Sequence, residues 1–299
     1  MNLLTFDFGG TSVKYTLWQS CKFLEVLSFP TPKTWEATKE KILEIKAKYA
    51  ADYSLSGATF SFPGCVDKQL GEIRGYSAIN YIHHFPIQQE LTSLLELPIA
   101  LENDANCAAL AEVWTGVAKG VKNVLFVVVG TGVGGAFVVD GKIHPGSHLY
   151  CGEFGFMFLA YDHNQPQQQN LSELGTAVKM AERYCQSKGV PKATFSGQEV
   201  FELAKQNDIV AIQEVEKFFQ YLSIGIFNLQ TSFDPEVIVI GGGISASPEI
   251  IAELEKRVNS LIEQVLIKDF KARILPCHYK NDANLLGAVK NFYNKMEAH

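Results

Sequence analysis

The chain has 299 residues, 47% of them hydrophobic, which is enough for about two domains with a large buried core. Its 32 acidic and 26 basic side chains give a formal net charge of -6, and no basic block interrupts the sequence. Because proteins that bind nucleic acids or anionic membranes cluster Lys and Arg, we expect neither kind of partner.

The beginning of the sequence and its cysteines favour a cytoplasmic protein. The first ten residues, MNLLTFDFGG, have neither the basic start nor the small-residue cleavage site of a secretory signal. The apolar stretch 124–139 is shorter than the roughly 20 residues that span a bilayer, and glycines interrupt it. Six scattered cysteines without a CxxC pair predict free, mostly buried thiols.

Two segments in the chain share one pattern, an apolar run, a glycine-rich turn and a returning alternating run. They span residues 3–18 and 124–142, and each predicts a strand hairpin, which suggests two related halves. The elements predicted between them are a helix from Thr34 to about Ala50, a strand at 55–64, and a weak strand at 99–101. The last strand runs into a helix that either Asn103 or Asp104 caps.

The second half of the sequence predicts mostly helices. A polar, Gln-rich loop at 162–170 comes first. The elements predicted after it are helices at 172–188, 197–206 and 210–232, a buried strand ending in three glycines, a helix with Pro248 at an early position, a strand at 272–277 and a terminal helix at 283–296. This alternation favours an α/β fold in two lobes, a smaller one of residues 1–112 joined by 284–299, and a larger one of residues 113–283.

The glycine-rich turn at residues 130–135 satisfies GxGxxG, yet it does not fit a dinucleotide-binding motif, because a strand-like run and not a helix follows it. A GxxxxGK[ST] motif is absent, which excludes a P-loop NTPase. A hairpin turn can still hold phosphate, since glycine lets the backbone N–H groups come close. The alternative is an ordinary hairpin turn.

The segment Asp7 to Lys14 (DFGGTSVK) resembles the DxGGTxxK phosphate motif of the sugar-kinase, Hsp70 and actin superfamily, and residues 130–135 resemble its second phosphate motif. Further motifs follow in the order seen in the ROK family (repressors, open reading frames and kinases): PG at 63–64, ENDA at 102–105, GEFG at 152–155, GGG at 241–243 and LGA at 286–288. The resemblance covers nearly the whole chain. It implies a two-lobed α/β fold of the actin-like ATPase (ribonuclease H-like) type.

The resemblance also implies an activity, the ATP-dependent phosphorylation of the 6-hydroxyl of a hexose or a derivative such as glucose, a β-glucoside or an N-acylhexosamine. Asp104 matches the catalytic aspartate; at a helix N-terminus it should be ionised and accept the hydroxyl proton, although without the resemblance its position favours a helix cap. The implied sugar ligands are Gly64, Asn80, Asn103, Asp104 and Glu153. The implied contacts of the ATP phosphates and of water-bound Mg²⁺ are Asp7, Gly9, Gly10, Thr11, Lys14, Thr131 and Gly132. Adenosine is expected on Gly241, Gly242 and Gly243.

One departure from the family pattern concerns zinc. Many members carry GHM followed by CxCGxxGC, whereas this chain has Gly155-Phe156-Met157 and a cysteine-free stretch at 162–170. We therefore expect no zinc. The change also removes a histidine and a glutamate that touch the sugar in zinc-bearing members, and Ser172 stands in place of the glutamate. A β-glucoside is hypothesised to fit as well as free glucose for this reason.

Two other functions are alternatives to the kinase. The ROK family includes sugar-responsive transcriptional regulators, so the chain could be one that lacks its DNA-binding domain; family repressors carry a helix-turn-helix before the first phosphate motif, for which Asp7 leaves no room. An Hsp70-like or actin-like ATPase would need a longer chain or a polymerising surface. The resemblance implies a homodimer, to which the apolar helices between 197 and 232 could contribute.

Overall fold

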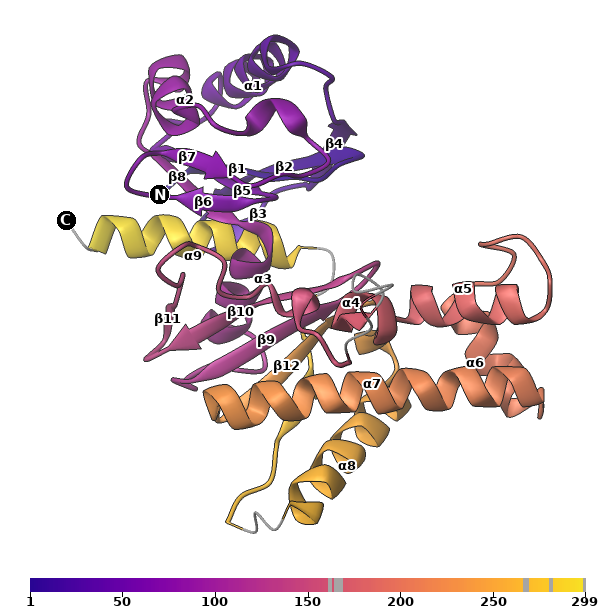
Figure 1. Cartoon of the computed structure of the whole chain (residues 1–299). Helices are drawn as coiled ribbons and strands as arrows, with labels where there is room; N and C mark the ends of the chain where they lie inside the picture. The colour runs from indigo at the N-terminus through magenta and orange to yellow at the C-terminus, as the bar shows by residue number, and fades with distance from the viewer. Residues whose placement is uncertain (161–162, 164–168, 266–268, 280–281, 298–299) are drawn as a thin grey trace. The chain divides into compact units, whose positions relative to one another are not determined.

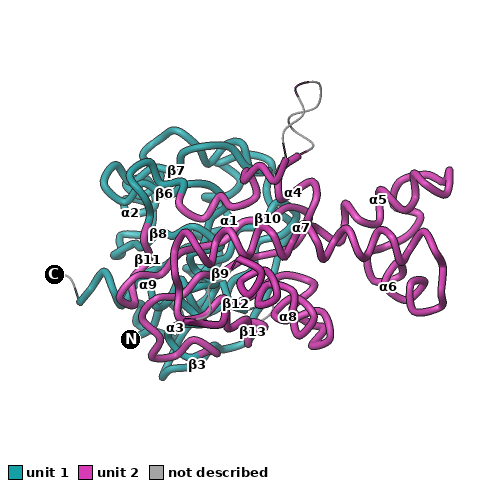
Figure 2. The backbone as a smooth tube through the Cα atoms, turned by 60° about the horizontal axis from the view of Figure 1, so that its bottom comes forward, with its two compact units in different colours: residues 1–115, 145–150, 281–299 teal, residues 116–144, 151–280 magenta. Residues whose placement is uncertain are grey.

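The computed structural model describes residues 1–160, 163, 169–265, 269–279 and 282–297. The chain forms two compact units, which Figure 2 shows in different colours. Residues 1–115, 145–150 and 281–299 make up unit 1, and residues 116–144 and 151–280 make up unit 2. In the part of the chain that the structure describes, no helix has the length and apolarity that a bilayer span needs.

The hairpin predicted at 3–18 forms the centre of the sheet in unit 1. β1 (Leu3–Phe8) pairs with β2 (Ser12–Gln19) in antiparallel fashion, and on its other side it pairs in parallel with β5 (Gly57–Phe62). β5 then pairs in parallel with β8 (Ile99–Asn103). Short strands that the pattern did not predict are β3 (Lys22–Phe23), β4 (Leu27–Pro30), and the ribbon of β6 (Cys65–Asp67) and β7 (Glu72–Arg74).

The helices of unit 1 include those predicted and one that was not. Thr34 caps the first predicted helix, since its hydroxyl accepts a hydrogen bond from the backbone N–H of Ala37. The helices are α1 (Trp35–Ala50), α2 (Ile87–Leu95), α3 (Asp104–Trp114) and α9 (Ala283–Glu297), with a 3₁₀ turn η1 (Asn80–Ile82). Figure 1 shows α9 running beside α3. The unpredicted helix is α2.

Every residue of β1 and of β5 is buried. The rings of Phe6 and Phe60 stack at 4.9 Å between centroids, and Phe8 contacts Phe62 at 4.5 Å. α9 packs on both strands, while side chains of α1 join the cluster that holds these rings. Both faces of the sheet are therefore covered, and the polar side chains of these strands are buried as well; the hydroxyl of Thr59, for example, donates to Ala288 O of α9.

Backbone contact between α3 and α9 fixes the terminal helix in unit 1. A Cβ at Gly287 of α9 would overlap the carbonyl oxygen of Cys107 of α3, so only glycine permits this approach. The side chain of Asn284, near the start of α9, donates a hydrogen bond to Asp7 Oδ1 at 3.1 Å. α9 thus contributes a side chain to the first phosphate motif.

The sheet of unit 2 repeats the strand arrangement of unit 1, as the similar sequence patterns of the two hairpins predicted. β9 pairs with β10 in antiparallel fashion and with β12 in parallel, and β12 pairs in parallel with β13. Its strands are β9 (Val124–Val129), β10 (Val133–Val139), β11 (Lys142–Ile143), β12 (Val237–Gly242) and β13 (Ile274–Pro276). The prediction of two related halves is confirmed at the level of the two sheets.

The helices of unit 2 correct one prediction. Residues 172–188 do not form one helix, because the chain breaks at Gly175 and Thr176. A Cβ at Gly175 would lie 2.8 Å from Leu171 Cδ1, and the hydroxyl of Thr176 caps the next helix by accepting from Lys179 N. The helices are α4 (Leu171–Leu174), α5 (Ala177–Ser187), α6 (Gly197–Lys205), α7 (Ile209–Phe233) and α8 (Pro248–Gln264), with 3₁₀ turns η2 (Phe154–Phe156) and η4 (Gly243–Ala246).

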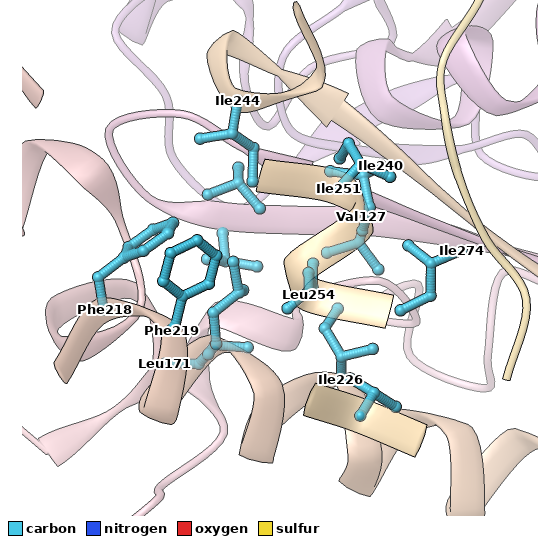
Figure 3. Packing of buried hydrophobic residues seen from close by; sticks show 14 of the residues in the cluster. Val127, Leu171, Phe218, Phe219, Ile226, Ile240, Ile244, Ile251, Leu254 and Ile274 are labelled. Carbon is cyan, nitrogen blue, oxygen red and sulfur yellow. The ribbon is translucent and has the colours of Figure 1, made fainter. Parts of the chain in front are cut away.

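The core of unit 2 lies between its sheet and its helices. Figure 3 shows Val127 of β9 and Ile240 of β12 packed near Ile226 of α7 and Leu254 of α8. The six cysteines are free thiols, as predicted, and three of them are buried. The loop predicted at 162–170 lies largely outside the described residues.

Candidate active site

The junction between β8 and α3 positions Asp104. Asn103 is the N-cap residue, and its Oδ1 accepts a hydrogen bond from Asn106 N at 3.1 Å. Asp104 is the first helical residue, and its Oδ1 accepts from Ala105 N at 2.8 Å and from Asn103 Nδ2 at 3.0 Å. Of the two capping residues that the sequence left open, the structure therefore selects Asn103 as the cap, and Asp104 is left for another role.

The carboxyl group of Asp104 has a pKa raised to about 6. Burial is the main cause, and the nearby negative charge of Asp7 adds to it, while the hydrogen bond from Ala105 N acts in the opposite direction. The sequence predicted an ionised group favoured by the helix N-terminus; the structure shows that burial outweighs that effect. A carboxylate with this pKa accepts a proton near neutral pH far more readily than an ordinary aspartate.

Asp7, the last residue but one of β1, carries the second carboxylate of the site. It is 9% exposed, and its Oδ1 accepts hydrogen bonds from Ser61 Oγ at 2.8 Å and from Asn284 Nδ2 at 3.1 Å. Burial raises its pKa, and the charge of Lys14, its partner across the hairpin, opposes that rise. The three neighbours therefore hold Asp7 in one orientation.

The turn after Asp7 is tight because two glycines form it. The backbone N–H of Gly9 donates to Ser12 O at 3.0 Å, and a Cβ at Gly10 would lie 2.8 Å from Ala78 Cβ. The hydroxyl of Thr31 donates to Gly9 O at 2.6 Å. Thr11 is exposed at the tip of this turn, where backbone N–H groups are open to an anion.

An ion pair between a buried glutamate and an exposed lysine supports the residues next to Asp104. Glu102 is 3% exposed, and its Oε2 lies 2.5 Å from Lys68 Nζ. Its Oε1 accepts from the backbone N–H of Asn103 at 2.8 Å and from Asn106 Nδ2 at 2.9 Å. Glu102 thereby holds two residues that flank Asp104, the cap residue Asn103 and Asn106 in the first turn of α3. The sequence analysis assigned no role to Glu102 or Lys68.

The candidate sugar ligands of unit 1 differ in how closely they lie to Asp104. The carbonyl of Gly64 accepts a hydrogen bond from Asn103 Nδ2 at 3.0 Å, so Gly64, Asn103 and Asp104 are joined. Gly64 has φ of +103°, and a Cβ there would lie 2.9 Å from the ring of His83. Asn80 is exposed at the start of η1, on the segment that follows β7.

In unit 2, the hairpin turn between β9 and β10 exposes Thr131 and Gly132. The hydroxyl oxygen of Ser172 on α4 accepts from Val133 N at 2.9 Å, and it lies 3.2 Å from the position of a Cβ at Gly132. Ser172 therefore fastens α4 to the turn. Glu153 precedes η2, is exposed, and has a pKa raised by partial desolvation.

A pocket of about 760 Å³ opens beside the three glycines at the end of β12. Gly243 and Gly130 line it, together with Val178 of α5, Phe201 and Lys205 of α6, and Ala246 of η4. The other two glycines have structural roles, since a Cβ at Gly242 would overlap Val129 O and one at Gly241 would press on the ring of Phe126. The pocket is large enough for a nucleoside.

This architecture defines a class of protein. Each unit carries a strand hairpin with a glycine turn, followed by parallel strands, and this repeated arrangement is the α/β fold of the actin-like ATPases, which includes sugar kinases, Hsp70 and actin.

Residues 3–294 match the ROK family. The chain belongs to this family. It is 32% identical over 302 residues to a β-glucoside kinase of Listeria monocytogenes, an alignment that covers 100% of both chains. A solved ROK family protein of Streptococcus pneumoniae in complex with sucrose is 31% identical, with a TM-score of 0.90 and 100% of both chains covered. The ROK hexokinase of Thermus thermophilus is 27% identical, with a TM-score of 0.85 and the same coverage.

Proposed function

We propose that this protein is an ATP-dependent sugar kinase that transfers the terminal phosphoryl group of ATP to the 6-hydroxyl of a hexose or hexose derivative. The observation that carries the proposal is the environment of Asp104. Its carboxyl group has a pKa of about 6, and the hydrogen bonds from Ala105 N and Asn103 Nδ2 both end on Oδ1. In this proposal Oδ2 is the atom that accepts the proton. The relatives named as sugar kinases support the same activity.

In this proposal Asp104 acts as the general base. Oδ2 accepts the proton of the sugar 6-hydroxyl as its oxygen attacks the γ-phosphorus of ATP, the bond to the bridging oxygen breaks, and ADP leaves. Asn103 and Gly64, which are hydrogen-bonded to one another, would bind sugar hydroxyls, as would Asn80 and Glu153. Candidate acceptors are glucose, a β-glucoside and an N-acylhexosamine.

ATP would be bound by the residues that the family resemblance implies. These are Gly9, Gly10, Thr11, Lys14, Thr131 and Gly132 for the phosphates, and adenosine would enter the pocket lined by Gly243. Asp7 suits Mg²⁺, because this ion is commonly bound through one or two carboxylates, water and substrate phosphates. Bound Mg²⁺ would neutralise part of the phosphate charge.

We keep the domain limits expected from the sequence as part of the proposal. They are a smaller lobe of residues 1–112 with 284–299 and a larger lobe of residues 113–283.

An acceptor panel tests the proposed activity. ADP release with MgATP is measured over glucose, mannose, N-acetylmannosamine, N-acetylglucosamine, fructose and phenyl β-D-glucoside, with 6-deoxyglucose as the matched control that lacks the reacting hydroxyl. We expect at least one hexose to stimulate ADP release, and phosphorus NMR to place the new ester on C6. Release that no sugar stimulates, or stimulation by 6-deoxyglucose equal to that by glucose, would contradict the proposal.

The pH dependence of the reaction follows from the raised pKa of Asp104. Because the base must be ionised, kcat/KM for the sugar is expected to rise with pH through about 6 and to level off above that value. The profile is measured under conditions in which ATP stays saturating. An acidic limb of the pH profile centred near 3.8, the ordinary pKa of aspartate, would show that burial does not raise the pKa of the base in the working enzyme.

We further propose that the protein needs no zinc. Phe156 occupies the place of the family's histidine, and phenylalanine cannot bind a metal. Purified protein is expected to contain less than about 0.1 zinc per chain by atomic emission, and its activity with MgATP is expected to survive a zinc-selective chelator. Stoichiometric zinc would overturn this expectation.

Three expectations about its surroundings complete the proposal. We infer a cytoplasmic protein, a homodimer, and no nucleic-acid or membrane partner. The net charge of -6 and the family resemblance support them. Light scattering after gel filtration gives the oligomeric state.

A further inference from the structure

A charged side chain that the proposed mechanism does not use lies two residues before the proposed base. Glu102 is 3% exposed, and both of its carboxylate oxygens have partners. Oε2 forms the ion pair with Lys68, and Oε1 accepts hydrogen bonds from Asn103 N and Asn106 Nδ2. Burial of a charge is costly unless the charge is paired and hydrogen-bonded. These three neighbours therefore satisfy the buried carboxylate.

The lysine of this pair is held in place, although its side chain is 55% exposed. Lys68 lies on the turn that joins β6 to β7, where Asp67 Oδ1 accepts hydrogen bonds from two backbone N–H groups at 3.0 Å. Its Nζ also donates to Asn291 Oδ1 of α9 at 2.9 Å, and Asn291 Nδ2 donates to Leu101 O of β8 at 3.0 Å. The turn and α9 thus direct the ammonium group onto Glu102.

Hydrogen bonds connect Glu102 to the proposed base. Glu102 Oε1 accepts from both Asn103 and Asn106, and Asn106 N donates to Asn103 Oδ1 at 3.1 Å, so the three residues form a closed ring. Because this last bond uses Asn103 Oδ1, the Nδ2 group of Asn103 faces Asp104 Oδ1 and Gly64 O, to which it donates at 3.0 Å. The orientation of the base thus depends on a ring that Glu102 closes.

The charge of Lys68 opposes that of Glu102 in the first turn of α3. The thiol of Cys107 is subject to both, since burial and the charge of Glu102 raise its pKa, whereas the charge of Lys68 lowers it. Without the ammonium group, an uncompensated negative charge would stay buried within two residues of Asp104, where like charges disfavour ionisation. The other titratable groups that act on these side chains or on their neighbours are Asp7 of β1, Lys14 of β2, Asp282 before α9 and Lys295 of α9.

We propose that Lys68 and Glu102 are positioning residues for Asp104: the ammonium group compensates the buried carboxylate, and the carboxylate orients Asn103 and, with it, the base. This inference rests on the proposed kinase function and adds two residues to it. Neither side chain needs to touch sugar or nucleotide. Because the two act as a unit, removal of one partner is expected to harm catalysis more than removal of both.

A double-mutant cycle on kcat tests the inference. The variants are Lys68→Met, Glu102→Gln and the double variant, with Lys39→Met as the matched control, because Lys39 forms an ion pair with Glu90 in the same unit. Methionine keeps most of the apolar stem of lysine. In Glu102→Gln the new amide N–H group faces the ammonium group of Lys68, a conflict between donors that the double variant lacks. We expect kcat to fall about 10²-fold in Lys68→Met and about tenfold in Glu102→Gln, and to recover to within about fivefold of the parent in the double variant.

Carboxyl ¹³C NMR without sugar or nucleotide gives a reading that does not depend on activity. The pKa of Asp104, about 6 in the parent, is assigned with the Asp104→Asn variant. It is expected to rise by about 0.5 or more in Lys68→Met, since the charge of Glu102 is no longer opposed, and to return to the parent value in the double variant. Lys39→Met should match the parent in both measurements.

The inference is overturned if the losses of kcat multiply in the double variant, if Lys68→Met keeps the kcat of the parent, or if Lys68→Met leaves the pKa of Asp104 unchanged. Should Lys68→Met fail to fold, Glu102→Gln and the double variant, which has no uncompensated charge, still distinguish recovery from further loss. The proposed kinase function fails by a different sign, an absence of sugar-stimulated ADP release from the parent protein. The NMR titration still reports on the pair in that case.

Discussion

Replacement of Asp104 with asparagine is expected to lower kcat by about 10³-fold and to leave sugar binding nearly unchanged. Asparagine keeps the size of the side chain and the Oδ1 atom that accepts from Ala105 N and Asn103 Nδ2. It removes the oxygen that would take the proton of the sugar hydroxyl. The measurement is steady-state ADP release with saturating MgATP, together with a calorimetric dissociation constant for the sugar.

The stability of this variant serves as its control for folding. Because burial raises the pKa of Asp104, the native state binds protons more tightly than the unfolded chain between pH 3.8 and about 6. Ionisation of Asp104 therefore costs stability as the pH rises through this window. Asp104→Asn removes that cost, so its Tm at pH 8 is expected to equal or exceed that of the parent. A variant that is stable and retains kcat within tenfold of the parent would remove Asp104 from the role of base.

Replacement of Asp7 with asparagine is expected to lower kcat/KM for ATP by about 10²-fold, because the first phosphate motif loses its negative charge. The buried carboxylate of Asp7 is held in one orientation by Ser61 and Asn284, and in the proposed role it would meet the water shell of a divalent cation. The Mg²⁺ concentration for half-maximal activity should rise in the same variant. Initial rates over a Mg²⁺ titration at fixed ATP give both quantities.

Ser61→Ala is the matched control for this experiment. It removes one hydrogen bond to Asp7 and keeps the carboxylate, so its effect is expected to be about tenfold or less. An Asp7→Asn variant with the Mg²⁺ dependence of the parent would show that Asp7 acts on the structure of the turn alone.

The parts of the fold that depend on local patterns were predictable from the sequence. Both hairpins, the capped helix after Thr34 and the junction at Asn103 were marked by glycines, capping residues and apolar periodicity within a few positions. The ribbon of β6 and β7 was not predicted, because strands of three residues carry too little alternation. The break between α4 and α5 lies at Gly175, the C-cap of α4, and Thr176, the N-cap of α5, which apolar periodicity alone does not reveal.

The residues that contact Asp7 and Glu102 in the candidate site could not be predicted from the sequence, for a different reason. Ser61 meets Asp7 through the parallel register of β1 and β5, and Asn284 reaches it from α9. Lys68 meets Glu102 across the fold of unit 1. Each pair depends on tertiary packing, and so does the burial that raises the pKa of Asp104. Motif order predicted the candidate reactive groups, whereas their environment required the structure.

The position of α9 has a consequence for how the protein is made. α9 packs on α3, β1, β5 and β8, yet its residues follow the whole of unit 2 in the sequence. On the ribosome, the strands and helices of unit 2 therefore emerge before unit 1 receives the helix that covers its sheet and supplies Asn284. Unit 1 must therefore stay incomplete until α9 has left the ribosome, and loss of α9 to a protease would undo it.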